Sequence, residues 1–180
     1  MLLSSQHSVL VVVDVQERLV PVVHEPQRML SNLQILLHAA RELRVPVLVT
    51  EQYPKGLGST LPAVLDGLAA DAIVEKTCFS GVMEPVFMDR LAALGRDQIV
   101  LTGCEAHVCV LQTALGLKGQ GRDVFLVADA VASRRPENAT LGIERMRQNG
   151  VSVVTTEMVA FEWLERSGTP AFKSVLPLIR

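Results

Sequence analysis

Hydrophobic residues fall into two patterns that alternate along the chain. Six short runs are almost continuously apolar and rich in β-branched residues, which is typical of strands buried on both faces of a sheet. These runs cover residues 8–14, 45–51, 71–76, 97–103, 122–129 and 151–157. In the other pattern, apolar positions recur every three or four residues, as in a helix that buries one side. It predicts helices over residues 26–44, 84–95, 106–121, 136–150, 158–166 and 170–180.

Buried strands that alternate with helices predict parallel pairing, with helices on both faces of the sheet. We therefore predict an α/β fold, namely a three-layer α/β/α sandwich with a six-stranded, mostly parallel sheet. A length of 180 residues fits one domain with a full core, which we expect to span residues 1–180. Proline and glycine interrupt residues 52–64, which we predict to be a long loop.

Charge and hydropathy restrict the partners of the chain. The formal net charge is −2 and no block of Lys and Arg exceeds a pair, which argues against nucleic acid and anionic membranes as partners. The apolar run near the N-terminus is cut by Asp14, too early for a signal peptide or a membrane span of about 20 residues. We expect a small-molecule substrate and no membrane association.

Two further features of the composition bear on compartment and assembly. Three cysteines cannot all pair within one chain, which favours a reducing cytoplasm. Apolar residues make up 49% of the chain and charged residues only 20%, which indicates apolar surface in a subunit interface. We expect a homo-oligomer in which the apolar region 158–180 covers a neighbouring subunit.

The predicted strands end in a short set of polar residues. In parallel α/β sheets, ligands bind beyond the carboxyl ends of the strands. Strand one ends in Asp14, strand three in Lys76 and strand five in Asp129, while strand two ends in Thr50 and Glu51. Strand four ends in Gly103, before the segment that holds Cys104, Glu105, His107 and Cys109. An Asp, a Lys and a Cys are thus expected to meet at one edge of the sheet.

Cys109 is the candidate nucleophile of this edge. It lies in the first turn of a predicted helix, where free N–H groups and the helix dipole stabilise a thiolate. An ammonium from Lys76 would lower the pKa of the thiol further, and Asp14 could accept its proton. Each residue also has a simpler interpretation: Cys109 as core packing, Asp14 as a turn or helix cap, and Lys76 as a surface lysine.

Metal and cofactor sites have little support in the sequence. The spacing of Cys104, His107 and Cys109 lacks the second ligand pair that structural zinc sites have. Glycine-rich phosphate loops follow none of the predicted strands, which argues against nucleotide cofactors. Cys78 is interpreted as a packing residue. We therefore predict neither a metal ion nor a cofactor.

Three segments together resemble the isochorismatase-like cysteine hydrolases, a superfamily that includes nicotinamidases and N-carbamoylsarcosine amidohydrolases. They are VLVVVDVQERL at 9–19, VEKTCFSGV at 74–82 and LTGCEAHVCVLQTAL at 101–115. The resemblance implies a catalytic triad of Asp14, Lys76 and Cys109. It also implies a cis peptide between Cys104 and Glu105, with an oxyanion hole formed by the backbone N–H groups of Glu105 and Cys109.

The implied activity is hydrolysis of a small C–N bond through a thioester on the cysteine. Nicotinamidases carry an Asp and two His after strand two as metal ligands, and residues 50–64 contain neither residue type. The resemblance is therefore to a metal-independent branch of undefined substrate. True isochorismatases have glycine in place of the nucleophile, so Cys109 argues against that reaction. The usual Thr-Asp pair before the nucleophile is Ala106-His107 here.

Five residues are candidates for substrate binding: Gln16, Gln52, Tyr53, Phe79 and His107. The two glutamines could instead bond loop backbone, and the two aromatic residues could only pack. Two other functions compete with hydrolysis. One is a catalytically idle interaction protein that keeps the fold, and the other is a thiol redox protein that uses Cys104 and Cys109.

Overall fold

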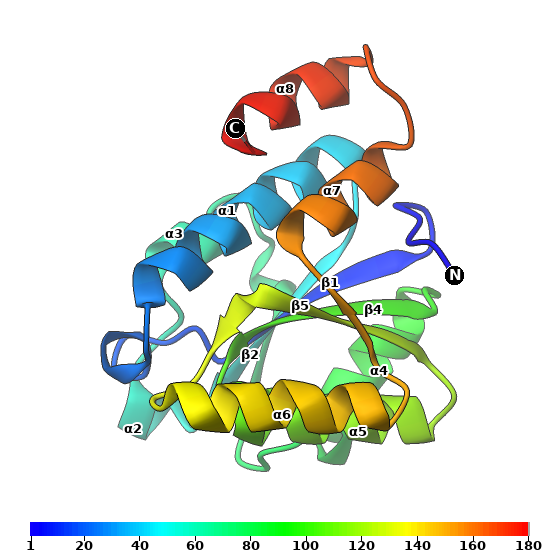
Figure 1. Ribbon diagram of the computed structural model, residues 1–180. Helices are drawn as coiled ribbons and strands as arrows, with labels where there is room; N and C mark the ends of the chain where they lie inside the picture. The colour runs from blue at the N-terminus through cyan, green and yellow to red at the C-terminus, as the bar shows by residue number, and fades with distance from the viewer. Residues whose placement is uncertain (180) are drawn as a thin grey trace.

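The computed structural model describes residues 1–179 and contains one six-stranded sheet (Figure 1). The strands are β1 (Ser8–Val13), β2 (Val47–Gln52), β3 (Ile73–Lys76), β4 (Gln98–Cys104), β5 (Asp123–Ala132) and β6 (Ser152–Val154). Their order is β3-β2-β1-β4-β5-β6, and all neighbouring pairs are parallel. The predicted α/β class with a six-stranded sheet is confirmed.

Helices cover both faces of the sheet (Figure 1). On one face lie α1 (Pro26–Leu43), α7 (Thr156–Leu164) and α8 (Pro170–Ile179), and on the other α4 (Pro85–Ala93), α5 (Leu111–Gly119) and α6 (Pro136–Gln148). β1 is apolar throughout because both of its faces are buried. Leu10 and Val12 belong to the first core layer, under α1, α7 and α8, and Val11 and Val13 belong to the second core layer, under α4, α5 and α6. No helix within residues 1–179 is long and apolar enough to cross a membrane.

The segment predicted as a long loop contains two short helices, α2 (Pro54–Leu57) and α3 (Pro62–Leu65). Each begins with proline, whose missing N–H costs nothing at the first helical position. Single 3₁₀ turns lie at Val20–Val22 (η1), Ala70–Ala72 (η2) and Gly81–Met83 (η3).

Other predicted boundaries change as well. The strand predicted over 151–157 shortens to β6, and α7 already begins at Thr156. β5 continues three residues past Asp129, whose carboxylate accepts hydrogen bonds from the N–H and hydroxyl of Thr156 at the start of α7. The predicted helix from 106 begins as a π-helical turn, η4 (Ala106–Val110), before α5 starts at Leu111. The last predicted helix is described to Ile179, and its residue 180 lies outside the described residues.

The order of the strands indicates where on the sheet a ligand would bind. β1 and β4 are neighbours in the centre of the sheet, although two strands separate them in sequence. In open α/β sheets, ligands bind beyond the carboxyl ends of the strands at such a point, where the connections on either side run to opposite edges of the sheet. Asp14 directly follows β1, and Glu105 directly follows β4.

Gly103 allows β4 to lie against β1 at this point. Its φ is +102°, and a Cβ atom there would lie 2.0 Å from the carbonyl oxygen of Val13. We expect Gly103→Ala to lower the free energy of unfolding by far more than the roughly 1 kcal/mol that separates glycine from alanine in regular structure. Denaturant unfolding followed by the fluorescence of Trp163, which is buried, measures the change.

Gly119→Ala is the matched control for this substitution. Gly119 lies at the end of α5, and a Cβ atom there would meet nothing within 4 Å. It should leave stability unchanged or raise it by up to about 1 kcal/mol. Equal effects of the two substitutions would contradict the close approach of β4 to Val13.

Candidate active site

Asp14 and Lys76 form a buried ion pair at the carboxyl ends of β1 and β3. Lys76 Nζ lies 2.8 Å from Asp14 Oδ2, and both side chains are 0% exposed. The second carboxylate oxygen of Asp14 accepts a hydrogen bond of 2.6 Å from the hydroxyl of Thr50. Thr50 stands opposite Val13 in the register of β2 with β1, which brings its side chain beside Asp14. Asp14 is therefore held by charge and hydrogen bonding rather than acting as a helix cap.

The ammonium group of Lys76 has further acceptors. Gln52 Oε1 lies 2.6 Å from Nζ, and the carbonyl oxygens of Cys78 and Phe79 lie at 3.4 Å. A buried charge is costly unless it is paired and hydrogen-bonded, and these acceptors satisfy that requirement. The interpretation of Lys76 as a surface lysine is therefore wrong.

The thiol of Cys109 completes the cluster. Cys109 is buried in η4, and both Asp14 and Lys76 act on the pKa of its thiol. Sequence reasoning expected a lowered pKa, but burial and the negative charge of Asp14 outweigh Lys76 and raise the pKa of Cys109 to about 12. The resting group is thus a neutral thiol beside a carboxylate, so attack by sulfur requires that Asp14 take the proton.

Burial also acts on the carboxylate. Removal from water raises the pKa of Asp14 above its ordinary value, and the Lys76 ammonium and the Thr50 hydroxyl oppose this only in part. A raised pKa makes a carboxylate a stronger base towards a thiol. Burial therefore raises the pKa of both the Cys109 thiol and the Asp14 carboxyl group. The gap between the two is smaller than it would be if burial acted on the thiol alone.

The segment between β4 and α5 presents backbone N–H groups near this cluster. The peptide between Cys104 and Glu105 is cis. The N–H groups of Val108 and Val110 both donate to the carbonyl of Glu105, at 3.0 and 3.3 Å, whereas that of Cys109 between them does not. Among residues 1–179, no acceptor is found for the N–H of Glu105. π-Helical turns of this kind are frequent at functional sites.

The side chains of Glu105 and His107 are turned towards the segment after β5. The Glu105 carboxylate is buried and accepts hydrogen bonds from the backbone N–H and Nε of Arg134, at 2.9 and 3.0 Å. His107 Nδ1 lies 2.9 Å from the hydroxyl of Ser133, and its Nε2 lies 3.4 Å from Asn138 Nδ2. His107 is thus fixed by protein groups, which makes it a poor candidate for holding a substrate.

Both glutamines proposed to bind substrate are bonded within the protein. Gln16 is fully buried, and its amide bonds the backbone of Gln52 on both sides and the carbonyl of Gly58. The amide of Gln52 bonds Lys76 through oxygen and the carbonyl of Thr77 through nitrogen. We therefore reassign both from substrate contact to positioning.

The two aromatic candidates are exposed. Tyr53 is 55% exposed and lines a cavity of about 340 Å³ together with Lys76 and Thr77. Phe79 is 54% exposed, on the loop whose carbonyl groups face Lys76. Both stay candidates for substrate contact.

The three cysteines are free thiols in different environments. Cys104 belongs to the core layer under α1, where its sulfur lies 3.3 Å from that of Met29, and burial raises the pKa of its thiol. Cys109 belongs to the opposite layer. Because the sheet lies between the two side chains, a redox pair of Cys104 and Cys109 is not favoured. Cys78 is partly exposed beside Glu84. Partial removal from water raises the pKa of its thiol, and the Glu84 carboxylate adds a smaller increase.

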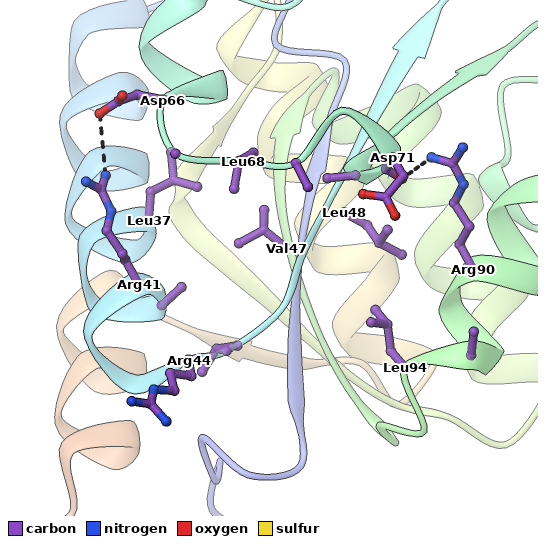
Figure 2. Close-up of a pocket in the computed structure, with 16 residues that line it drawn as sticks. Leu37, Arg41, Arg44, Val47, Leu48, Asp66, Leu68, Asp71, Arg90 and Leu94 are labelled. Carbon is purple, nitrogen blue, oxygen red and sulfur yellow. Dashed lines mark hydrogen bonds and ion pairs between the residues drawn. The ribbon is translucent and has the colours of Figure 1, made fainter.

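A separate cavity of about 450 Å³ lies between α1, α4 and the segment before β3 (Figure 2). Val47 and Leu48, the first residues of β2, are among its lining residues. It therefore lies at the opposite end of this strand from Gln52 and the ion pair. Figure 2 shows aliphatic side chains inside, with Arg41 paired to Asp66 at one side.

Several residues that build the site were not recognised from the sequence. Thr50 was noted only as a strand end, although strand alternation beside Asp14 could have indicated its role. Glu84 accepts hydrogen bonds from the N–H groups of Thr77 and Cys78 and so shapes the loop after Lys76. Arg134 gave no signal, because its contact with Glu105 spans 29 positions.

Comparison with known proteins identifies the family. Residues 8–158 match the isochorismatase domain, which is most of the chain. The chain belongs to the isochorismatase family. Among relatives, isochorismatase domain-containing protein 2 of Danio rerio is 38% identical over 179 residues, which cover 98% of this chain and 89% of the relative.

Solved structures of other proteins agree with the fold. A structure of MAR1 ribonuclease from Caenorhabditis elegans has a TM-score of 0.92 and 37% identity, and the match covers 99% of this chain and 92% of the other. The YcaC gene product from Escherichia coli, described as an octameric hydrolase of unknown specificity, has a TM-score of 0.93. That match covers 99% of this chain and 90% of the other; at 22% identity it bears on the fold alone.

Proposed function

We propose that this isochorismatase-family chain is a cysteine hydrolase that cleaves a C–N bond of a small amide through a thioester on Cys109. The observation that carries the proposal is the buried 2.8 Å pair of Asp14 and Lys76, with the buried Cys109 thiol near enough for both to act on its pKa. A base, a fixed positive charge and a nucleophile close together form the arrangement that nucleophilic catalysis requires. The proposal needs no metal ion, since Asp14 supplies the base and Lys76 the positive charge.

The first half of the proposed reaction transfers the acyl group to sulfur. Asp14 takes the thiol proton as Cys109 Sγ bonds to the amide carbon, and Lys76 stabilises the negative charge as it moves. The carbonyl oxygen becomes an oxyanion that accepts hydrogen bonds from the N–H groups of Glu105 and Cys109. One such donor is worth about 10²–10³-fold in rate. The C–N bond then breaks, and the leaving nitrogen receives the proton from Asp14.

The second half releases the acid. Asp14 takes a proton from water as the water oxygen attacks the thioester carbon. The C–S bond breaks, and the sulfur of Cys109 regains a proton through Asp14. The sum is amide plus water giving a carboxylic acid and an amine, with every side chain returned to its starting state.

Acid should inactivate the enzyme at a higher pH than an ordinary aspartate would impose. Asp14 must be ionised to accept the proton, and burial raises its pKa, so activity disappears as the pH falls through that raised value. Thr50→Val removes a donor that lowers the pKa of Asp14, so it should move the acid limb of kcat/KM further upwards. A limb at or below about pH 4, or a shift in the other direction, would contradict Asp14 as the base.

An idle interaction protein and a ribonuclease are the rival functions. The first predicts no hydrolysis of any small amide, and the second is suggested by the description of the Caenorhabditis elegans relative. The net charge of −2 favours a small substrate over RNA. Assaying a panel of small primary amides and N-carbamoyl acids beside RNA separates these functions. RNA cleavage that survives Cys109→Ala, without amide hydrolysis, would favour a ribonuclease.

We also keep the homo-oligomer and the cytoplasm as proposals. Met158, Phe161 and Leu178, on α7 and α8, expose much of their apolar surface, and all three cysteines are free thiols. Light scattering coupled to size exclusion should give a mass above the 19.6 kDa of one chain. A monomer at every concentration would overturn the first of these proposals.

A further inference from the structure

Gln52 has a place in the cluster that substrate binding does not explain. Its Oε1 lies 2.6 Å from Lys76 Nζ, slightly closer than the carboxylate of Asp14 at 2.8 Å. Its Nε2 donates to the carbonyl of Thr77 at 2.8 Å. That second bond fixes the orientation of the amide, because a reversed amide would bring its NH₂ group against the ammonium and its oxygen against the carbonyl.

The backbone of Gln52 is held in place by the side chain of Gln16. Its backbone N–H donates to Gln16 Oε1 at 2.8 Å, and its carbonyl accepts from Gln16 Nε2 at 3.0 Å. In the register of β2 with β3, Gln52 stands opposite Lys76. The amide is therefore held on both its backbone and its side chain, with its oxygen directed at one atom.

We propose that Gln52 is a positioning residue that holds the ammonium group of Lys76 oriented towards Asp14 and Cys109. An ammonium has three N–H donors and no acceptor. Asp14 and Gln52 take the two short bonds, which leaves one donor for Cys109 and the weaker carbonyl contacts at 3.4 Å.

Neutrality is the useful property of this acceptor. An amide satisfies the ammonium without adding negative charge, so the positive charge of Lys76 stays available to Asp14 and to the sulfur as it becomes anionic. A carboxylate at the same position would pair with Lys76 and disfavour the thiolate, since a like charge within a few ångströms opposes ionisation of the thiol. This inference deepens the proposed function, because it assigns a role within the same site.

Alkylation of Cys109 by iodoacetamide tests the inference without any substrate. The rate at Cys109 is followed from about pH 6 to 10 by peptide mass spectrometry, with retained folding checked by the fluorescence of buried Trp163. Gln52→Glu should slow alkylation of Cys109 at least about tenfold at a given pH and move its profile to higher pH. Gln52→Met, which removes the acceptor without adding charge, should slow it by a smaller factor.

Gln98→Glu is the matched control. Gln98 is buried like Gln52, and its Oε1 accepts a hydrogen bond from the hydroxyl of Ser8. It is the first residue of β4 and so lies at the opposite end of that strand from the site. It should leave the alkylation profile of Cys109 unchanged. An unchanged profile in both folded Gln52 variants, or an equal shift in Gln98→Glu, would overturn the inference. Failure to find amide hydrolysis would instead count against the proposed function and leave this result intact.

Discussion

Replacing Cys109 by alanine should abolish amide hydrolysis, with a loss of at least about 10³-fold in kcat, because no other group in the cluster can form the thioester. The variant should remain folded, since it loses only one buried sulfur atom from the second core layer. The measurement is product formation from the amide panel with purified protein. Unfolding curves recorded in parallel report any loss of stability.

Cys104→Ala and Cys78→Ala are the controls for this result. Cys104 lies in the other core layer beside Met29, and Cys78 lies on the loop after Lys76, so both substitutions change a thiol without changing the nucleophile. Both should keep turnover within a few-fold of the parent. Equal losses in Cys104→Ala and Cys109→Ala would point instead to a general effect on the fold or to chemistry that uses both thiols.

Asp14→Asn should have the largest effect on stability. It leaves the Lys76 ammonium buried without a counter-charge, which costs about 3–5 kcal/mol in comparable buried pairs. Asparagine tolerates the left-handed backbone that Asp14 adopts at φ +52°, so the change tests charge rather than conformation. Denaturant unfolding near neutral pH measures the loss of unfolding free energy, and hydrolysis should be lost as well.

The double variant Asp14→Asn with Lys76→Met provides the check on this interpretation. It removes both charges and fills the space of Lys76 with an apolar side chain, so it should be more stable than Asp14→Asn alone. Activity should not return, because the base and the positive charge are both absent. If the double variant were no more stable than the single one, the ion pair would not be the source of the effect.

Much of the fold follows from local pattern. The continuous apolar runs and the helical periodicity indicated the parallel sheet, because a strand buried on both faces cannot alternate polar and apolar residues. The short helices α2 and α3 were missed because each consists of a single turn, and propensity says little over four residues. The extension of β5 past Asp129 depends on a contact with Thr156, which no local pattern contains.

The site was predictable to the extent that it lies at strand ends. The ends of β1 and β3 were singled out because the carboxyl ends of parallel strands share an edge, and Asp14 and Lys76 form an ion pair there. The raised pKa of Cys109 was not predictable, because it depends on how deeply the thiol is buried and on its contact with Asp14. The partners of Gln52 were equally hidden, since they are fixed by the register of β2 with β3.

Trapping the acyl-enzyme tests the central claim most directly. The protein is mixed with each amide of the panel, quenched in acid during turnover and examined by intact mass spectrometry followed by peptide mapping. The proposed mechanism predicts a mass increase equal to the acyl group, located at Cys109 and absent in Cys109→Ala. Hydrolysis that proceeds at the parental rate in Cys109→Ala, with no adduct on the parent protein, would contradict it.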